Sequence, residues 1–379
     1  MIENLIQNQI GITVFLSVIV LISVSNLFAL KPLKNFKCSG ISPRVSILLP
    51  VRNEESNILA CLETLLNQDY ADYEVIVLED CSTDATWELL NSIAANYDKL
   101  QVFKGLPLPS GWVGKNWACH QLSQKASGDL LLFTDADTRH QANMLSLAVS
   151  CMNKTGAQML SVLPRQELFT WAEKLSIPII YWALMSFSPL LLVFRIRAPF
   201  LAFAIGQYML FQSHAYRSIG GHAAIRGSVL DDIELTRQLI KARWRWIIVD
   251  GSQGIHCRMY TDFNQVHEGL AKNLFSVFGQ NIPLYLFIWI WIFVIFFQPV
   301  VMLSLIMTGV LSSNIITALV IADMLLAFIS WAIVAVRFAF IPYLCFSYYA
   351  VVIITEIIAF SSIVKSITHS NTWKGRRLM

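Results

Sequence analysis

Charged residues are scarce in this chain of 379 residues: Asp, Glu, Lys and Arg make up 14% of it, and the net charge at pH 7 is only +3. So small a charge argues against nucleic acid as a partner. Cysteine is also scarce, with seven residues, and no two of them show the Cys-x-x-Cys spacing of a zinc or redox site. An odd number of scattered cysteines argues against a disulfide framework and favours reduced thiols.

Hydrophobic residues are what the chain has in excess, at 55% of the sequence, with a mean hydropathy of +0.56. These values are too apolar for an ordinary soluble enzyme. The length is enough for one catalytic domain together with a membrane part. The composition therefore predicts a protein that is partly soluble and partly embedded in lipid.

Residues 10–30 form an uncharged run that is long enough to span a bilayer. No basic residue precedes the run, whereas Lys31, Lys34 and Lys37 follow it, which is the reverse of a cleaved signal peptide. We interpret residues 1–43 as a retained transmembrane anchor and a basic linker. The positive charge predicts that the linker lies in the cytoplasm.

The C-terminal part, residues 261–379, is predicted to contain an interfacial helix and then three spans: Ile282–Met307, Ile315–Val336 and Ala339–Val364. The tail carries Lys374, Arg376 and Arg377, and this charge favours a cytoplasmic end. Three crossings after a cytoplasmic domain would place the tail on the other side. A re-entrant hairpin or an additional span would resolve the conflict.

Another uncharged run, residues 175–194, contains two prolines and precedes Arg195 and Arg197. A full crossing here would separate two halves of the candidate site described below. We therefore interpret the apolar insert near residues 170–205 as an interfacial or re-entrant segment, with a buried core helix as the alternative.

Between residues 44 and 260, short apolar β-rich runs alternate with amphipathic segments, which is typical of an α/β domain with a parallel sheet. The predicted strands are Val45–Val51, Glu74–Glu79, Gln101–Lys104, Asp129–Thr134 and Ala157–Leu163. The predicted helices are Glu54–Asn67, Asp84–Asn96, Lys115–Lys125 and Gln141–Asn153. Three strands end in polar clusters, which are expected to share one crevice because ligands bind beyond the carboxyl ends of such strands.

The strongest single feature is an Asp-x-Asp sequence, Asp135 and Asp137, directly after an apolar strand. Two carboxylates one residue apart at a strand end can face a diphosphate through a shared hard cation. Mg²⁺ or Mn²⁺ at this place stabilises a leaving nucleoside diphosphate. Taken alone, the motif more often marks a solvated turn, but its position and its polar neighbours favour the metal site.

Polar clusters also end the first two strands, at Pro50–Glu55 and Glu79–Asp84. Their carboxylates can accept hydrogen bonds from a ribose or a base N–H, although Asn53 and Ser82 are also plausible helix N-caps. Further along, a glycine-containing turn opens a helix with Lys115, which suits an anion. An ordinary loop-to-helix junction is the alternative.

Asp231 and Asp232 stand at the predicted start of another helix, after Gly220–His222. A carboxylate in this place can deprotonate a hydroxyl as a general base. Asp232 is the candidate for this base, with Asp231 beside it. The alternative is that both acids are there because the helix dipole favours negative charge at its N-terminus.

In this order, the motifs PVRNEE, EDCSTD, TDAD and GGH…LDD resemble the family 2 glycosyltransferases over roughly residues 44–260. The resemblance implies the GT-A fold, an α/β, Rossmann-like fold of nucleotide-diphospho-sugar transferases, here with transmembrane helices at both ends of the chain. It implies an inverting enzyme that uses a nucleotide sugar, usually UDP-linked, and a divalent metal, Mn²⁺ or Mg²⁺. Asp137 and Asp135 would hold the metal, and Asp232 would be the catalytic base.

The same resemblance implies that Glu79, Asp80 and Asp135 bind the nucleotide sugar. Pro50, Arg52, Glu54 and Lys115 are further candidates for this role. Arg258 is a candidate as well, with a charge at the membrane surface as the equal alternative. The segment PSGWVGKNWA, and the order of anchor, catalytic domain and spans, are similar to a narrower group that includes carotenoid, hopene-associated and ceramide glycosyltransferases. No Gln-x-x-Arg-Trp motif is present, which argues against processive polysaccharide synthesis. We therefore expect a multi-pass protein of the cell (inner) membrane that glycosylates a lipid, such as a carotenoid or hopanoid, at the cytoplasmic face.

Two alternatives stay open at this point. A polyprenyl-phosphate glycosyltransferase would need a basic pocket, for which Arg195, Arg197 and Arg258 are the only support. A catalytically silent membrane scaffold that keeps the fold is the other alternative. The retained carboxylates of Asp137 and Asp232 weigh against it.

Overall fold

A computed structural model describes residues 2–36, 40, 42–196, 198–368 and 370–377. Lys37, Cys38 and Arg197, on which some of the expectations above depend, lie outside the described residues. The chain divides into two compact units. The helical unit comprises Met1–Ala29, Leu168–Leu191 and Tyr260–Asn371, and the sheet unit comprises Leu30–Glu167, Leu192–Met259 and Thr372–Met379.

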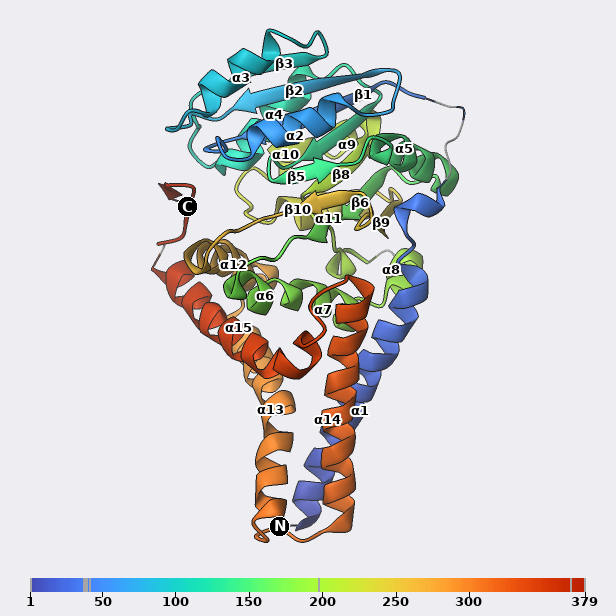
Figure 1. The fold of residues 1–379 in the computed structure, drawn as a ribbon, viewed down its shortest axis with the longest axis vertical. Helices are drawn as coiled ribbons and strands as arrows, with labels where there is room; N and C mark the ends of the chain where they lie inside the picture. Colours follow the sequence, from blue (N-terminus) through green and yellow to red (C-terminus); the bar gives the residue numbers. More distant parts are fainter. Residues whose placement is uncertain (1, 37–39, 41, 197, 369, 378–379) are drawn as a thin grey trace. The chain divides into compact units, whose positions relative to one another are not determined.

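The sheet unit is built on a seven-stranded sheet with the order β3-β2-β1-β4-β8-β6-β9 (Figure 1). Its strands are β1 (Val45–Val51), β2 (Tyr73–Glu79), β3 (Leu100–Lys104), β4 (Leu130–Thr134), β6 (Met159–Leu163), β8 (Tyr208–Gln212) and β9 (Trp246–Asp250). The first four run parallel to one another, and β1, β2 and β4 are almost wholly buried. Burial of consecutive residues is expected where helices cover both faces of a sheet.

One strand corrects the expectation of a parallel sheet. β8 runs antiparallel to both of its neighbours, β4 and β6, so the sheet is mixed. Its residues Tyr208–Phe211 are buried, which gives β8 the same continuous apolar pattern as the parallel strands. That pattern carries no information about strand direction.

Helices connect the strands of the sheet unit and pack against them. They are α2 (Ile58–Leu66), α3 (Thr86–Ala94), α4 (Gly114–Lys125), α5 (Met144–Thr155), α9 (Ser213–Ser218), α10 (Gly221–Ala224) and α11 (Asp231–Lys241), with the short helices η1 (Leu33–Asn35) and η2 (Pro199–Leu201). A second, three-stranded sheet has the order β5-β10-β7 and consists of β5 (Thr138–His140), β10 (Ile255–Cys257) and β7 (Arg165–Gln166). A C-terminal hairpin is formed by β11 (Thr372–Trp373) and β12 (Arg376–Arg377).

The first two predicted helices begin later than expected, because the residues before them form loops at the strand ends. Asn53 and Cys81 have φ values of 51° and 53°, which is left-handed backbone and cannot continue a helix. Asn53 and Ser82 do not act as N-caps. Instead the Asn53 N–H donates to Ser82 Oγ at 3.0 Å and the Thr83 N–H donates to Asn53 Oδ1 at 2.8 Å, so the two loops hold each other.

Within the described residues, the helical unit contains four helices that are long and apolar enough to cross a membrane: α1 (Ile2–Ala29), α13 (Ile282–Met307), α14 (Asn314–Arg337) and α15 (Leu344–Ile367). In Figure 1, α14 runs beside both α1 and α13. The shorter helices α6 (Trp171–Ser176), α7 (Pro178–Phe187) and α12 (Phe263–Val277) complete the unit. Trp171–Phe187 and the following α8 (Leu190–Ile196) are bent by 63° at their junction, the geometry of a broken span or a re-entrant loop.

Candidate functional site

The carboxyl ends of β1, β2 and β4 lie at one edge of the sheet, because these strands are neighbours and parallel (Figure 1). The residues that follow them are Arg52 and Glu54 after β1, Asp80 after β2, and Asp135 and Asp137 after β4. Three clusters that are far apart in the sequence are therefore brought to one edge, as predicted from their places at strand ends.

A tight turn holds the Asp-x-Asp sequence between β4 and β5. Thr138 donates to the Asp135 carbonyl from its N–H at 3.3 Å and from its hydroxyl at 2.7 Å. The hydroxyl of Thr134, the last residue of β4, donates to the Gln207 carbonyl at 2.7 Å. Both threonine hydroxyls are thus engaged with backbone carbonyls, which stabilises the turn that carries Asp135 and Asp137.

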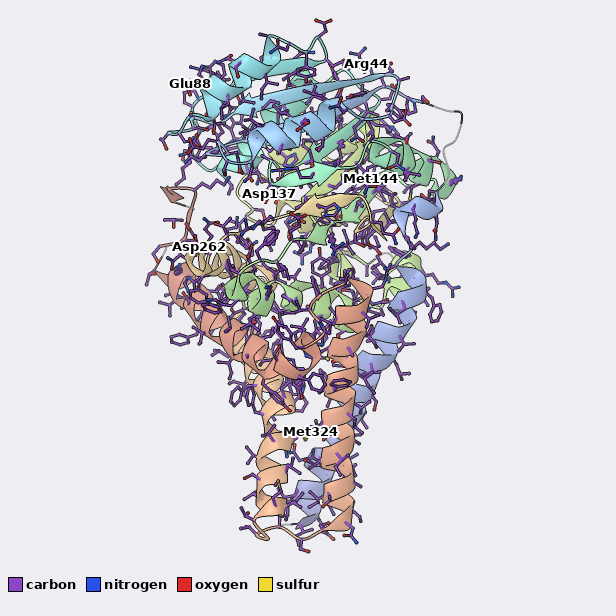
Figure 2. All side chains as sticks on the ribbon, viewed as in Figure 1. Arg44, Glu88, Asp137, Met144, Asp262 and Met324 are labelled. Carbon is purple, nitrogen blue, oxygen red and sulfur yellow. The ribbon has the colours of Figure 1, made fainter. Side chains whose placement is uncertain are left out.

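Asp137, labelled in Figure 2, is the half-buried carboxylate of this turn. Its Oδ1 is buried and makes no hydrogen bond to any residue that the structure describes. Burial, and then the nearby carboxylates of Asp135 and Glu54, raise the pKa of Asp137 to about 7. A carboxylate with an unsatisfied oxygen and a raised pKa is one that a cation would stabilise.

Lys115 joins the Asp-x-Asp turn to a second pair of acids. Its Nζ lies 3.0 Å from Asp135 Oδ1 and 3.3 Å from Asp231 Oδ2. Burial by itself would lower the pKa of Lys115, but the two carboxylates outweigh it and raise that pKa well above its usual value. The lysine is therefore a fixed positive charge between the start of α4, the end of β4 and the start of α11.

Asn116 explains why α4 and α11 meet at this point. Its side-chain amide donates to the carbonyls of Ile225 at 3.0 Å and Ser228 at 2.8 Å, in the loop that leads into α11. The N–H of Val113, just before α4, donates to the Arg226 carbonyl at 2.7 Å. Asn116 is only 1% exposed, so these bonds are shielded from water and hold the two helix starts together.

Asp232 lies on the same side, in the first turn of α11. Its Oδ1 accepts the Ile233 N–H at 2.8 Å and its Oδ2 accepts the Gly206 N–H at 3.1 Å. A Cβ on Gly206 would lie 3.3 Å from the Lys115 Nζ and 3.8 Å from Asp232 Oδ2, so the absence of a side chain lets this backbone approach both groups. Burial, and then the neighbouring carboxylate of Asp231, raise the pKa of Asp232 to about 7.

Asp80 is the buried carboxylate beyond β2, with 4% of its surface exposed. Its Oδ2 is bound by the Arg376 guanidinium, whereas its Oδ1 is buried and has no hydrogen-bond partner in the described part of the chain. Burial raises the pKa of Asp80, although Arg376 acts in the opposite direction. Next to it, Glu79 accepts the Ser82 N–H and so shapes the loop.

Three other predicted donor-binding residues belong to β1 and the loop that follows it. Arg52 donates from Nη1 to the carbonyls of Asp80 and Cys81, both at 2.7 Å, and so braces the loop after β2. Glu54 is bound by Lys374. Pro50 lies within β1, opposite Leu78 of β2, and is part of the sheet rather than of the loop.

Arg258 lies at the Asp-x-Asp turn, where its N–H donates to the Asp137 carbonyl at 3.2 Å. The predicted companion Arg195 is exposed on α8. His222 of the Gly-Gly-His sequence is fully buried, and its Nδ1 lies 2.7 Å from Tyr216 Oη. Burial lowers the pKa of His222 to about 3, so this neutral side chain supports the core behind the site.

The residues of the Asp-x-Asp turn fit a divalent cation that is shared with a substrate. No group of three His, Cys, Asp or Glu side chains within the described ranges is placed to hold a metal by itself. Mg²⁺, however, is commonly bound by one or two carboxylates together with phosphate oxygens and water. The unsatisfied Oδ1 of Asp137 beside Asp135 matches that kind of site.

Four contributors to this arrangement were absent from the residue-level predictions: Asn116, Gly206, Lys374 and Arg376. For Lys374 and Arg376, the sequence predicted only a positively charged tail on the cytoplasmic side. Asn116 and Gly206 act through backbone contacts that have no sequence signature. A basic cluster after the last apolar helix was the one available signal for the other two.

A family model described as "Glycosyl transferase family 2" matches residues 46–220. An N-acetylglucosaminyltransferase of Bradyrhizobium elkanii is 32% identical over 138 residues, which cover 35% of this chain and 74% of that protein. The chain belongs to glycosyl transferase family 2. The resemblance predicted from the polar clusters is thereby confirmed.

For other relatives of this family 2 member, the match covers a smaller share of the relative's length. A 4,4'-diaponeurosporenoate glycosyltransferase of Staphylococcus haemolyticus is 23% identical over 234 residues, or 61% of this chain and 60% of that one. A beta-monoglucosyldiacylglycerol synthase of Nostoc is 36% identical over 108 residues, or 28% of this chain and 23% of that one. For the first curated relatives, the chain spans only 23% to 38% of their length.

Among solved structures, this family 2 member is similar to the mannosyltransferase PcManGT from Pyrobaculum calidifontis, determined in complex with GDP-Man and Mn²⁺. The TM-score is 0.57 at 16% identity, and the match covers 98% of this chain and all (100%) of that one. The predicted GT-A fold with apolar helices at both ends is confirmed.

Proposed function

We propose that this protein is an inverting, metal-dependent glycosyltransferase that moves a sugar from a nucleoside-diphosphate sugar to the hydroxyl of a lipid acceptor. One observation carries the proposal: Lys115 pairs with both Asp135 and Asp231. A turn that suits a diphosphate is thereby joined to an acid pair that suits a general base. Transfer needs the donor and the activated hydroxyl in such close, fixed proximity.

Asp232 is the proposed base. The N–H groups of Gly206 and Ile233 fix its carboxylate, and a pKa of about 7 lets it take a proton while remaining largely ionised above neutral pH. The acceptor hydroxyl gives its proton to Asp232 as its oxygen attacks the anomeric carbon of the sugar. Attack from the side opposite the leaving diphosphate inverts the configuration of that carbon.

Asp135 and Asp137 are the residues that would hold Mn²⁺ or Mg²⁺, and a bound ion supplies charge stabilisation for the leaving nucleoside diphosphate. Lys115 adds a fixed positive charge on the same side of the turn. Asp80 Oδ1 is available to accept an N–H or O–H from the nucleoside, for which we propose uridine.

The acceptor is proposed to be a lipid. Four long apolar helices provide a membrane part, and two relatives are named for glycosyl transfer that involves a carotenoid acid or a diacylglycerol. A carotenoid, a hopanoid or another apolar lipid with a free hydroxyl group fits this class. A substrate of this kind is reached from the bilayer rather than from solution.

The connectivity supports a topology with the sheet unit wholly on one side of the membrane. The chain leaves the sheet unit at Leu168 and re-enters it after Leu191. The bent segment between them would therefore cross the membrane an even number of times or, as a re-entrant loop, not at all. Tyr260–Asn371 also leaves and returns, so not all three of its long helices would cross. Because lysines follow α1, we propose that the sheet unit is cytoplasmic, in a multi-pass protein of the inner membrane.

The acceptor class is tested with purified full-length protein, Mn²⁺, labelled UDP-sugars or GDP-mannose, and a membrane lipid extract. We expect the label to move into the organic phase, and to stay in the aqueous phase with Asp232→Asn. A label found only in water-soluble products would contradict a lipid acceptor. A strict requirement for added polyprenyl phosphate would favour that class of acceptor instead.

The rate of transfer should depend on the ionisation of Asp232. At saturating donor and metal, which keep Asp137 ionised, we expect turnover to rise from pH 6 to pH 8 and to fall about tenfold per unit well below the pKa. Lys115 lowers the pKa of Asp232 electrostatically, so Lys115→Met should shift the profile to higher pH. A flat profile over this range would argue against Asp232 as the base.

A further inference from the structure

The C-terminal hairpin (Thr372–Arg377) returns to the sheet unit and binds the loops that follow β1 and β2. Its turn residues, Lys374 and Gly375, have φ values of 45° and 75°, the left-handed backbone of a tight hairpin turn. Glycine adopts this backbone freely, but lysine does so uncommonly. The turn therefore holds the Lys374 side chain in one direction at some conformational cost.

Lys374 and Arg376 of the hairpin both reach predicted donor-binding residues. The Arg376 guanidinium binds the Asp80 carboxylate through Nη1 and the Asp80 carbonyl through Nη2, the latter at 3.3 Å. The Lys374 ammonium binds the Glu54 carboxylate and the Arg52 carbonyl, the latter at 2.9 Å. In return, Arg52 Nε donates to the Lys374 carbonyl at 3.3 Å. Contacts in both directions show that the hairpin is docked at this edge and does not merely pass it.

The start of α4 is shaped to accept Arg376. A Cβ added to Gly114 would lie 2.9 Å from Arg376 Nη1 and 3.3 Å from Asp80 Oδ2, so a side chain here would require the guanidinium to shift. Glycine at this position thus makes room for the guanidinium beside a helix N-terminus, where the helix dipole itself disfavours a cation and favours an anion.

The hairpin brings two cations next to Arg52. Arg52, Lys374 and Arg376 lie close together, and burial and then Arg376 lower the pKa of Arg52. Lys374 also binds Glu54, whose carboxylate is one of the charges that lie near Asp137. The hairpin therefore faces both the Asp80 end and the Asp137 end of the site.

One oxygen of Asp80 is left for a ligand. Arg376 binds Oδ2, while Oδ1 is buried without a hydrogen-bond partner among the described residues. A buried carboxylate oxygen without a partner is unfavourable, and an N–H or O–H from a ligand would satisfy it. The hairpin thus orients Asp80 without using up its capacity to accept hydrogen bonds.

We propose that the C-terminal hairpin completes the donor site of this protein, with Arg376 as a positioning residue that orients Asp80 toward the nucleoside and Lys374 as a residue that contacts the diphosphate. The proposal rests on the proposed function, since it assumes a nucleoside-diphosphate donor. It predicts that a region at the far end of the chain, 296 residues after Asp80 in the case of Arg376, determines affinity for the donor. The competing arrangement is autoinhibition, in which the hairpin must leave the loops after β1 and β2 before the donor binds.

The test measures binding of UDP and of GDP, each with Mn²⁺, to the full-length protein by calorimetry, together with the kinetic constants for transfer. We expect Arg376→Gln, Lys374→Ala and a chain ending at Asn371 each to weaken binding of the preferred nucleotide about tenfold to a hundredfold. The KM for the donor should rise in the same proportion, with kcat much less affected. Arg217→Ala, which removes an exposed cation of α9, is the matched control and should bind normally.

Uridine and UDP separate the two roles, if UDP is the preferred nucleotide. Lys374→Ala should weaken UDP while leaving uridine unchanged, whereas Arg376→Gln should weaken both. The melting temperature without ligand should stay near that of the unchanged protein, because the hairpin adds little to the core. Normal or tighter nucleotide binding in the variants would overturn the proposal, and tighter binding would indicate autoinhibition. If the unchanged protein binds neither nucleotide, the proposed function itself fails.

Discussion

Asp232→Asn is expected to reduce transfer by about a thousandfold, within the range for loss of a general base. The amide keeps the shape of the carboxylate and can still accept the Gly206 N–H with its one carbonyl oxygen. It cannot take the proton of the acceptor hydroxyl. Because the change leaves the Asp-x-Asp turn and Lys115 in place, the affinity for UDP with Mn²⁺ should change no more than about twofold. Single-turnover transfer and nucleotide titration measure the two quantities.

Glu234→Gln is the matched control for this prediction. Glu234 belongs to the same first turn of α11 and its change removes the same charge, but its carboxylate pairs with Arg237. We expect this variant to keep most of its activity. If the acids of this turn acted only through their charge at the helix N-terminus, both substitutions would reduce activity alike. A loss of donor affinity in Asp232→Asn as large as that in Asp137→Ala would remove Asp232 from the role of base.

Asp137→Ala is expected to abolish metal-dependent donor binding and to lower transfer by about a hundredfold to a thousandfold. The side chain supplies the buried oxygen that no described residue satisfies, and alanine leaves a cation with Asp135 alone. EDTA should stop turnover of the unchanged protein, and added Mn²⁺ or Mg²⁺ should restore it. In Asp137→Ala, the same addition should restore little.

Asp129→Ala provides the comparison for the metal prediction. Asp129 is an exposed acid immediately before β4, at the opposite end of the strand from the Asp-x-Asp turn. Its removal changes the net charge equally and should leave metal dependence intact. Full turnover in the presence of EDTA, or equal metal affinity in Asp137→Ala and Asp129→Ala, would contradict a metal site at Asp135 and Asp137.

Local patterns predicted most of the sheet and the positions of several candidate site residues at strand ends. β1 begins and ends where its apolar run does, and the other predicted strands agree within two residues. The Asp-x-Asp turn and Asp80 follow strands, so their convergence needed only the rule that parallel neighbours end at one edge. The direction of β8 was beyond such reasoning, since a strand buried on both faces has the same pattern in either direction.

The sequence by itself determined the family, the candidate acids and the apolar helices, because each of these is written in short, contiguous patterns. Only the tertiary structure decided that Lys115 faces Asp231, that Gly206 approaches Asp232, and that the C-terminal hairpin binds the loops after β1 and β2. Such contacts join residues that are far apart along the chain. They depend on where the folded chain returns, and the periodicity of a local segment does not encode that path.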